Sequence, residues 1–443
     1  MATSTPDVLR LLFNALPDSA QGGDQNDKLY VNRTSDAESD AVANLIQYID
    51  WAPLSDQTYL FSGLRGAGKT TELNRLIREL RGLGIAAYYC DASRYLNLND
   101  PQLSLPELLM AALAGLADSV RQELGTDFLT DSIWQRTKRL LGSNVEVKPS
   151  LEVGTPQGKV KVEATLKENP DFRRELIESV KRSSEFYSEA VGFAKDVTTL
   201  IRSRTNSDKI VLVVDSLERL SAPAGDESKL FDSLKEVFFN DPQRLRFPGF
   251  SVVYSAPPYL HAVLPSVNGG FSQCVSLPNF KVMQRPAAGA QPIRNAEGIA
   301  LMVQIVSQRF PRWPEVLSLT VLEELAWLSG GNVRRYFSLV RALARKAGLS
   351  QAVLPITDLD STAVQHAISD AAQPLLWLTA EDHRWLLRFM NDAQGAAAQV
   401  ENLQKDLPAI IRLFDHSLVL DYRNGEAWYQ VPPLVRRYAS PQP

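Results

Sequence analysis

Short apolar runs alternate with longer stretches of helical spacing over the first two thirds of the chain. The four clearest runs, rich in β-branched and aromatic residues, occupy residues 58–62, 85–91, 209–215 and 250–256. Runs of this kind are typical of strands covered on both faces of a parallel sheet. The segment 70–83 between the first two runs has helical spacing, and this strand, helix, strand order predicts an α/β fold. A fifth run, at 273–282, contains Pro278, a residue poorly tolerated in a central strand.

A long insertion, at about residues 100–206, separates the second predicted strand from the third. It holds helical stretches at 104–124 and 172–204. Between them, apolar and polar residues alternate on both sides of a turn that contains glycine and proline. This period-two pattern predicts a β-hairpin at residues 145–166 with one apolar face, which must pack on this chain or on another.

In the C-terminal third of the chain, the pattern of apolar and polar residues changes twice. Helical spacing is clearest at residues 299–310, 317–328 and 332–347. Two further amphipathic segments, 381–390 and 407–414, precede a hairpin at 418–431, in which Asn424 and Gly425 suit a type I′ turn. Helices followed by a two-stranded hairpin predict a small winged-helix-like α+β domain.

These patterns divide the chain into four predicted parts. An amphipathic leader and a polar linker make up residues 1–28. A three-layer α/β core occupies residues 29–285 and includes the insertion, a helical lid follows at 286–371, and the winged-helix-like domain covers 372–443.

Composition excludes several classes of protein. The 443 residues carry a formal net charge of −4, so the chain as a whole is no polycation built for nucleic acid or an anionic membrane. Its two cysteines, Cys90 and Cys274, cannot form a disulfide framework or a four-thiolate zinc site. The longest apolar run, residues 108–117, is about half the length needed to cross a bilayer. The N-terminus has no basic residue before its apolar stretch, and we expect a cytoplasmic protein with no membrane partner.

The strongest chemical signal is the segment 63–70, Gly-Leu-Arg-Gly-Ala-Gly-Lys-Thr. It matches the phosphate-binding pattern G-x-x-x-x-G-K-[ST] and lies between a predicted strand and a predicted helix. Its glycines allow backbone N–H groups to point at phosphate oxygens, and the helix N-terminus adds a positive dipole end. Lys69 is expected to contact the β- and γ-phosphates, and the Thr70 hydroxyl to bind Mg²⁺. The predicted nucleotide-binding residues here are Gly63, Arg65, Gly66, Ala67, Gly68, Lys69, Thr70 and Thr71.

An enzyme with this loop needs an acidic residue at the end of another strand to hold the metal. Asp215 ends the third predicted strand and is, with Thr70, the predicted metal ligand. Two acids are candidates for the general base that activates water: Glu218, three positions after Asp215, and Asp91, at the end of the second strand. We assign the role to Glu218 and keep Asp91 as its competitor.

The order of four segments resembles AAA+/STAND-type ATPases. The layout is close to the ATPases of origin recognition complexes and to prokaryotic conflict-associated NTPases. The segments occupy residues 61–73, 214–220, 253–257 and 329–334. The resemblance implies a P-loop NTPase core followed by a lid, with ATP and Mg²⁺ as cofactors.

The resemblance also assigns individual residues. Ser255 corresponds to a sensor that orients the attacking water, although an ordinary strand-terminal serine is the alternative. Arg334 corresponds to a second sensor that contacts the γ-phosphate from the lid, and its alternative is a solvated basic helix face. Arg33 ends a short segment, Tyr-Val-Asn-Arg, which resembles the segment lining the adenine pocket in these proteins.

One departure from the family concerns catalysis. AAA+ rings usually place an arginine finger after the first sensor, yet residues 256–284 contain no arginine. Arg244 and Arg246 precede the sensor strand and would have to act in trans with a different geometry. The missing finger favours a slow switch, in which ATP occupancy sets the conformation, over a fast ring motor.

The winged-helix-like domain raises the question of DNA. Between residues 377 and 443 there are seven basic and eight acidic residues, and the candidate recognition helix at 407–414 offers only Arg412. Because affinity for DNA comes largely from phosphate neutralisation, we favour a domain that contacts protein or is autoinhibitory.

The sequence thus predicts a slow, Mg²⁺-dependent ATPase that acts as a switch. Its expected partners are further copies of itself or a protein encoded nearby, and the resemblance alone suggests bacterial antiphage defence. The alternative is a DNA-binding ATPase of the origin-recognition or loader type. A third hypothesis is a structural adapter that holds nucleotide permanently.

Overall fold

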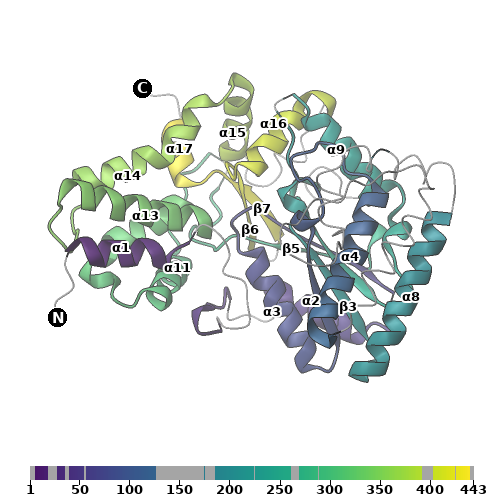
Figure 1. The fold of residues 1–443 in the computed structure, drawn as a ribbon. Coiled ribbons are helices and arrows are strands. Elements are labelled where there is room, and N and C mark those ends of the chain that lie inside the picture. The colour runs from purple at the N-terminus through teal and green to yellow at the C-terminus, as the bar shows by residue number, and fades with distance from the viewer. Residues whose placement is uncertain are drawn as a thin grey trace, which may run out of the picture. The chain divides into compact units, whose positions relative to one another are not determined.

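The computed structural model divides into two compact units (Figure 1). Unit 1 comprises Met1–Asn44, Gly63–Asn74 and Ser276–Pro443, and unit 2 comprises Leu45–Ser62 and Arg75–Val275. The structure describes residues 5–17, 27–34, 39–53, 56–125, 174, 185–223, 225–260, 269–287, 289–391, 403–424 and 426–439. The hairpin predicted at 145–166 lies outside these residues.

A five-stranded sheet with the strand order β2-β3-β4-β1-β5 confirms the predicted α/β fold. The strands are β1 (Thr58–Gly63), β2 (Ala86–Asp91), β3 (Ile210–Asp215), β4 (Ser251–Ala256) and β5 (Gln273–Leu277). The pairings of β2 with β3, β3 with β4 and β4 with β1 are all parallel. Every residue of β1, β3 and β4 is buried, which explains their continuous apolar sequence. The fifth strand is shorter than predicted and stops just before Pro278.

The register aligns polar residues along one edge of the sheet. Parallel strands end at the same edge of a sheet. At this edge Asp91 of β2 lies opposite Asp215 of β3, and Ser255 lies near the end of β4, opposite Phe61 of β1. Beyond Ser62, β1 continues into the loop that begins at Gly63. Helix α3 (Lys69–Gly82) follows this loop, as the sequence predicted.

Helices cover the sheet of unit 2. Helix α4 (Leu105–Leu124) packs on β2 and β3, and α8 (Glu185–Thr205) packs on α4. The approach of α4 is close enough to require Gly115, since a Cβ there would lie 2.1 Å from Sγ of Cys90. Helix α9 (Glu227–Lys235) belongs to the same unit. Helix α2 (Ala41–Trp51) begins after Asp40, whose carboxylate accepts from the N–H groups of Val42 and Ala43.

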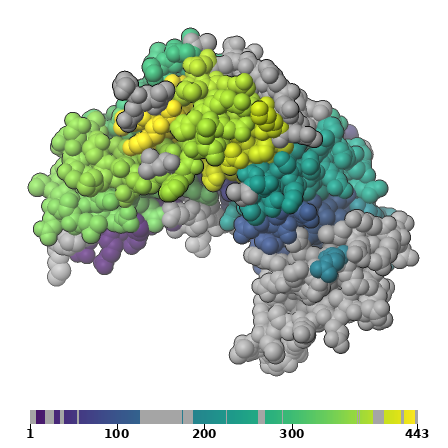
Figure 2. Space-filling model, turned by 90° about the horizontal axis from the view of Figure 1, so that it is seen from above, coloured from purple at the N-terminus to yellow at the C-terminus, as the bar shows by residue number. Residues whose placement is uncertain are grey.

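Unit 1 contains a group of helices built around α13. The group comprises α1 (Thr5–Ala15), α11 (Ala296–Arg309), α12 (Leu319–Ser329), α13 (Val333–Ser350) and α14 (Thr362–Ala372). Helix α13 contacts α1, α12 and α14, and the purple α1 lies beside the green helices in Figures 1 and 2. Arg341 of α13 lies over the ring of Phe13, 4.3 Å from its centroid. The amphipathic leader therefore buries its apolar face in the same unit as the predicted lid.

The C-terminal module consists of α15 (Ala380–Asn391), α16 (Leu403–Asp415), β6 (Leu420–Asn424), β7 (Glu426–Gln430) and α17 (Pro433–Ala439). Strands β6 and β7 pair antiparallel, which confirms the predicted hairpin. Aromatic packing holds the module together, with the Tyr422 and Trp428 rings stacked at 4.5 Å. The short helix α17 was not predicted.

None of the helices in the described ranges has the length and apolar character to cross a membrane.

The packing of α1 on α13 makes a prediction about stability. Leu12 is fully buried, whereas its neighbour Leu11 is 45% exposed. Because Leu12→Ala leaves a cavity, we expect it to lower the free energy of unfolding by about 2–4 kcal/mol in urea denaturation. The matched control Leu11→Ala should cost less than about 1 kcal/mol. Equal effects of the two substitutions would mean that α1 is not anchored by its apolar face.

Candidate functional site

The loop between β1 and α3 depends on two glycines. Gly66 has φ +79° and Gly68 has φ +97°, in the left-handed region that side chains disfavour. Both glycines are also crowded. A Cβ on Gly66 would lie 2.6 Å from Cβ of Arg334, and a Cβ on Gly68 would lie 2.7 Å from Nη2 of Arg33. These contacts bring the predicted residues Arg33 and Arg334 against the loop, all within unit 1.

Lys69 folds back over the loop. Its Nζ donates to the carbonyl oxygens of Gly63, at 2.7 Å, and Leu64, at 2.9 Å, and the residue is 4% exposed. The ammonium is therefore held at the loop by neutral acceptors. A phosphate group bound in the loop would offer charged oxygens, which form stronger hydrogen bonds with an ammonium.

Arg33 is fixed at the loop by four contacts. It donates through Nε to Glu72 Oε1 at 3.0 Å, through Nη1 to the Pro278 carbonyl at 2.9 Å, and through Nη2 to the Ala67 carbonyl. Its guanidinium lies 4.4 Å from the centroid of the Phe280 ring. Glu72, which the sequence did not single out, also accepts from the Tyr30 hydroxyl at 3.3 Å. Its position in the first turn after the motif is the only sequence signal that could have indicated it.

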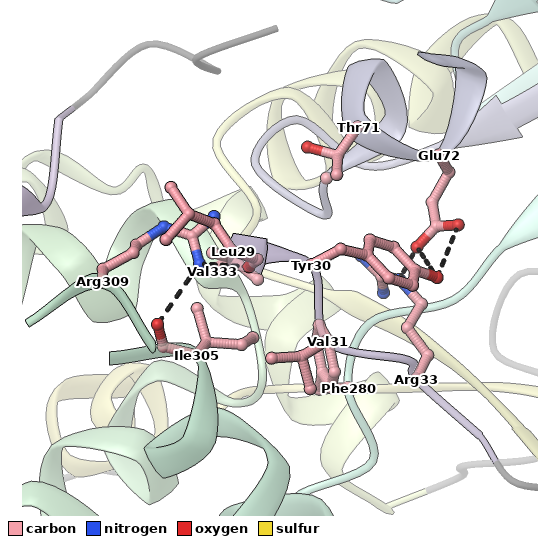
Figure 3. A pocket seen from close by; sticks show the side chains of 11 residues that line it. Leu29, Tyr30, Val31, Arg33, Thr71, Glu72, Phe280, Ile305, Arg309 and Val333 are labelled. Atoms are coloured by element: carbon pink, nitrogen blue, oxygen red, sulfur yellow. Dashed lines mark hydrogen bonds and ion pairs between the residues drawn. The ribbon is translucent and has the colours of Figure 1, made fainter. Parts of the chain in front are cut away.

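A small cavity opens beside these residues (Figure 3). Its volume is about 50 Å³, and its walls come from the segment 29–33, the start of α3, Phe280, α11 and Val333. Thr71, predicted to bind nucleotide, lines it. Arg309 of α11 donates to the carbonyls of Leu29 and Ile305, and burial lowers the pKa of its guanidinium. The cavity thus combines apolar walls with a few oriented polar groups.

The N-terminus of α13 rests on the loop. Asn332 caps this helix by accepting from the Arg335 N–H, and its side-chain Nδ2 donates to the Arg65 carbonyl at 2.8 Å. The Arg334 N–H donates to the Gly66 carbonyl at 3.3 Å. The helix end therefore directs its positive dipole end and a cationic residue toward the loop.

The C-terminal module also contacts the loop, which the sequence did not predict. The Ser417 hydroxyl donates to the Arg65 carbonyl at 3.2 Å, and Arg65 lies 3.9 Å from the carboxylate of Asp415. A few residues further on, Asp421 is 4% exposed. It accepts from the Ser276 hydroxyl at 3.1 Å and from Nδ2 of Asn279 at 3.0 Å.

The buried position of Asp421 changes its acidity. Burial raises the pKa of this carboxyl to about 6, against the opposing effects of the Ser276 hydrogen bond and the charges of Arg423 and Lys69. Lys69 is thus electrostatically coupled to a strand of the C-terminal module.

In unit 2, the predicted metal ligand Asp215 is completely buried. Its Oδ1 accepts from the Ser216 N–H at 2.7 Å, and its Oδ2 accepts from the Tyr89 hydroxyl at 2.8 Å. Ser216 has φ +75°, an uncommon conformation for serine that concentrates at functional sites. Tyr89 is a second residue that the sequence did not single out.

The other predicted site residues of unit 2 differ in their hydrogen bonds and in their positions. Ser255 accepts from the Leu217 N–H at 2.9 Å, so its side chain supports the turn after Asp215. Asp91 accepts from the Ser93 N–H at 3.0 Å and caps a short 3₁₀ turn. Glu218 lies in the 3₁₀ turn Leu217–Arg219 and is 7% exposed.

Arg244, one of the two arginines considered for action in trans, already has partners in unit 2. Arg244 pairs with Asp241 at 2.5 Å and lies 5.1 Å from the centroid of the Tyr187 ring. Its side chain is 55% exposed.

Each unit, taken by itself, carries groups of the kind that bind a nucleotide or a divalent cation. In unit 1 the left-handed glycines give the loop a backbone conformation of the kind that directs N–H groups at phosphate oxygens. Thr70 is at the start of α3 and Asp215 ends β3, and hydroxyl and carboxylate oxygens are the ligands that Mg²⁺ prefers.

Comparisons with known proteins give limited similarity. No family model and no curated protein matches the sequence. Cdc6p from Pyrobaculum aerophilum is 11% identical over 94% of this chain and 98% of its own, with a TM-score of 0.35. The Thermotoga maritima RuvB Holliday junction branch migration motor is 13% identical over 96% and 97%, at 0.34. Drosophila ORC bound to GC-rich DNA and Cdc6 is 10% identical over 93% of this chain and 53% of that one, at 0.36. At these scores, the function must be sought in the residues of this chain.

The raised pKa of Asp421 predicts a pH dependence of stability. Its ordinary value is 3.8 and its folded value about 6, so the folded state binds the proton more tightly. This contribution is fully present below pH 3.8 and is lost as pH rises through 6. Between pH 4.5 and 7.5 we expect a loss of about 2 kcal/mol from this carboxyl.

Urea unfolding at both pH values measures the loss. Asp421→Asn should remove about 2 kcal/mol of the pH-dependent difference. Asp370→Asn, at an exposed carboxylate of α14, serves as the matched control and should leave that decline in place. An unchanged decline in Asp421→Asn would show that the carboxyl is not buried as described.

Proposed function

We propose that this protein is an ATP-binding switch with slow, Mg²⁺-dependent ATPase activity, of the AAA+/STAND type. One observation carries the proposal. The phosphate-binding loop of unit 1 is contacted both by the N-terminus of α13 and by the C-terminal module, at Asn332, Arg334 and Ser417. A nucleotide held by this loop would therefore meet the residues that hold the other two elements.

The loop residues have distinct roles in this proposal. The N–H groups around Gly66, Ala67 and Gly68 bind the phosphates, and Lys69 exchanges the Gly63 and Leu64 carbonyls for the β- and γ-phosphate oxygens. The cavity beside Thr71 and Phe280 takes the base, with Arg33 at its rim. Arg334, from the lid, responds to the γ-phosphate.

Hydrolysis requires the residues of the strand ends. Thr70 and Asp215 supply oxygen ligands for Mg²⁺, which neutralises charge on the phosphates when bound. Ser255 orients the turn after Asp215. We assign the general base to Glu218 rather than Asp91, because the Asp91 carboxylate already caps a helical turn.

Slow turnover follows from the missing arginine. Residues 256–284 contain none, and Arg244 is held by Asp241 and Tyr187. An arginine finger contributes about 10³–10⁵ in rate in enzymes that have one. The occupancy of the loop, more than the rate of hydrolysis, would then set the state of the lid and the C-terminal module. Such a switch would control self-assembly or a protein encoded nearby. A role in bacterial antiphage defence rests on sequence resemblance alone.

The alternative is a DNA-binding ATPase of the origin-recognition type, for which the hairpin β6–β7 after α16 is the supporting feature. The candidate recognition helix, α16, is poorly suited to binding DNA. Arg412 donates to the carboxylate of Asp382 at 2.8 Å, and most described residues of α16 are buried. A cation already paired with an acid contributes little phosphate neutralisation.

Two substitutions test the nucleotide site. Lys69→Ala should abolish binding of a fluorescent ATP analogue. Asp215→Asn should reduce phosphate release to the Lys69→Ala background, because the metal loses its carboxylate. Lys229→Ala, at a lysine paired with Asp226 on the surface of α9, is the matched control and should bind and hydrolyse as the wild type does. Equal analogue binding by wild type and Lys69→Ala would disprove the site. Release above that background by the wild type would exclude a permanently loaded adapter.

Salt dependence tests the alternative. A DNA-binding ATPase should bind duplex DNA with an affinity that falls by orders of magnitude between about 50 and 200 mM salt. We expect no specific duplex binding in fluorescence anisotropy. A steep salt slope, lowered by about 1 in Arg412→Ala, would favour the DNA-binding function over the switch.

A further inference from the structure

The last residues of β5 contact both the phosphate-binding loop and the C-terminal module. A Cβ on Gly63 would lie 3.0 Å from the Leu277 carbonyl oxygen and 3.3 Å from Cδ of Lys69. The preceding residue, Ser276, donates its hydroxyl to Asp421 Oδ2 at 3.1 Å. All of these residues belong to unit 1. The end of β5 therefore joins the loop that holds Lys69 to the strand that carries Asp421.

Two buried amides make a second connection. The Asn279 N–H donates to the Asp421 carbonyl at 3.0 Å, and its Nδ2 donates to Asp421 Oδ1, also at 3.0 Å. Nδ2 of Asn332 lies 3.5 Å from Oδ1 of Asn279 and donates to the Arg65 carbonyl at 2.8 Å. Asn279 and Asn332 are 3% and 2% exposed. The carboxyl of Asp421 is thus linked to the loop through side chains that are shielded from water.

The charged groups around Asp421 differ in how a nucleotide would affect them. Arg423, on the same strand, and Lys69, in the loop, both oppose the effect of burial on the Asp421 pKa. Tyr422 and Tyr429, the latter opposite Asp421 on β7, have raised pKa values because they are buried, so both stay neutral. Of these four groups, Lys69 is the one that belongs to the phosphate-binding loop.

The positive charge of Lys69 is therefore shared between two negative groups. It favours the ionised form of Asp421 when the loop is empty. Phosphates bound beside Lys69 would balance that charge, and they would also add negative charge that disfavours a second anion nearby. By the reciprocity of linked equilibria, an ionised Asp421 must weaken phosphate binding by the same factor.

We propose that a filled phosphate site and a protonated Asp421 stabilise one another, so that the nucleotide is bound together with a proton. The proton comes from the solvent, adds to a carboxylate oxygen of Asp421, and returns to the solvent when the nucleotide leaves. No bond of the nucleotide changes in this step. The inference rests on the proposed function, since it assumes that phosphates bind beside Lys69. Burial raises the pKa of Asp421 to about 6, which places the coupling near neutral pH.

The test measures nucleotide affinity as a function of pH. A fluorescent ATP analogue is titrated at constant MgCl₂ between about pH 5.5 and 8 into wild type, Asp421→Asn and Asp370→Asn. Asp370 is the matched control, because it is an exposed carboxylate of the same unit. The phosphates of the analogue also titrate in this range, but their effect is the same for every protein and cancels in the ratio of affinities.

We expect Asp421→Asn, which mimics the neutral carboxyl, to bind the analogue about 5-fold or more tightly than the wild type at pH 8. At pH 5.5 the two proteins should bind almost equally, and Asp370→Asn should follow the wild type throughout. A gain of affinity cannot result from a damaged fold. If wild type binds the analogue but Asp421→Asn binds no more tightly at pH 8, the inference fails and the proposed function stands. Absence of binding by the wild type at every pH would overturn the proposed function itself.

Two further variants separate Asp421 from other causes. Ser276→Ala removes a hydrogen bond that favours the ionised carboxyl, so the pH at which wild-type affinity falls should move upward. An unmoved pH profile in Ser276→Ala would count against the inference. His416 also titrates near neutral pH, since burial and the charge of Arg65 lower its pKa. His416→Gln should keep the pH dependence of the wild type, and loss of that dependence in this variant alone would assign the proton to His416.

Discussion

A single backbone carbonyl connects three parts of unit 1. The Arg65 oxygen, in the loop between β1 and α3, accepts from Asn332 at the start of α13 and from Ser417 in the C-terminal module. The approach requires glycine at position 66, because a side chain there would collide with Arg334. The loop whose glycines adopt the left-handed conformation is thus also contacted by α13 and by the C-terminal module.

An electrostatic interaction also links this loop to the C-terminal module. Lys69 is held by loop carbonyls, and it is one of the cations that oppose the effect of burial on Asp421. A phosphate that draws the ammonium toward itself would weaken this opposition and change the balance at a buried strand of the module. Differential contacts of this kind are what allow a ligand to shift a conformational equilibrium. They provide a physical route from occupancy of the loop to a change in the C-terminal module.

The sequence predicted the parts better than their contacts. The strands were visible because buried parallel strands need continuous apolar residues, and the loop was visible because its glycines and lysine follow a fixed spacing. The β6–β7 hairpin was predictable because Asn424 and Gly425 suit a type I′ turn. The resemblance to AAA+/STAND-type ATPases singled out Arg33 and Arg334 as site residues, and both lie against the loop. By contrast, Tyr89 and Ser417 carry no local pattern, and only its position in the first turn after the motif marks Glu72. Each matters only through a partner distant in the sequence, which is information that the order of residues alone does not contain.

The central claim is that a nucleotide in the loop is sensed by the C-terminal module. Hydrogen exchange of the peptides covering residues 330–336 and 413–421, with and without a non-hydrolysable ATP analogue and Mg²⁺, tests it most directly. We expect the analogue to increase exchange at 413–421 and to alter it at 330–336 in the wild type, and to do neither in Lys69→Ala. Unchanged exchange in both segments, under conditions in which the analogue is bound, would contradict the account.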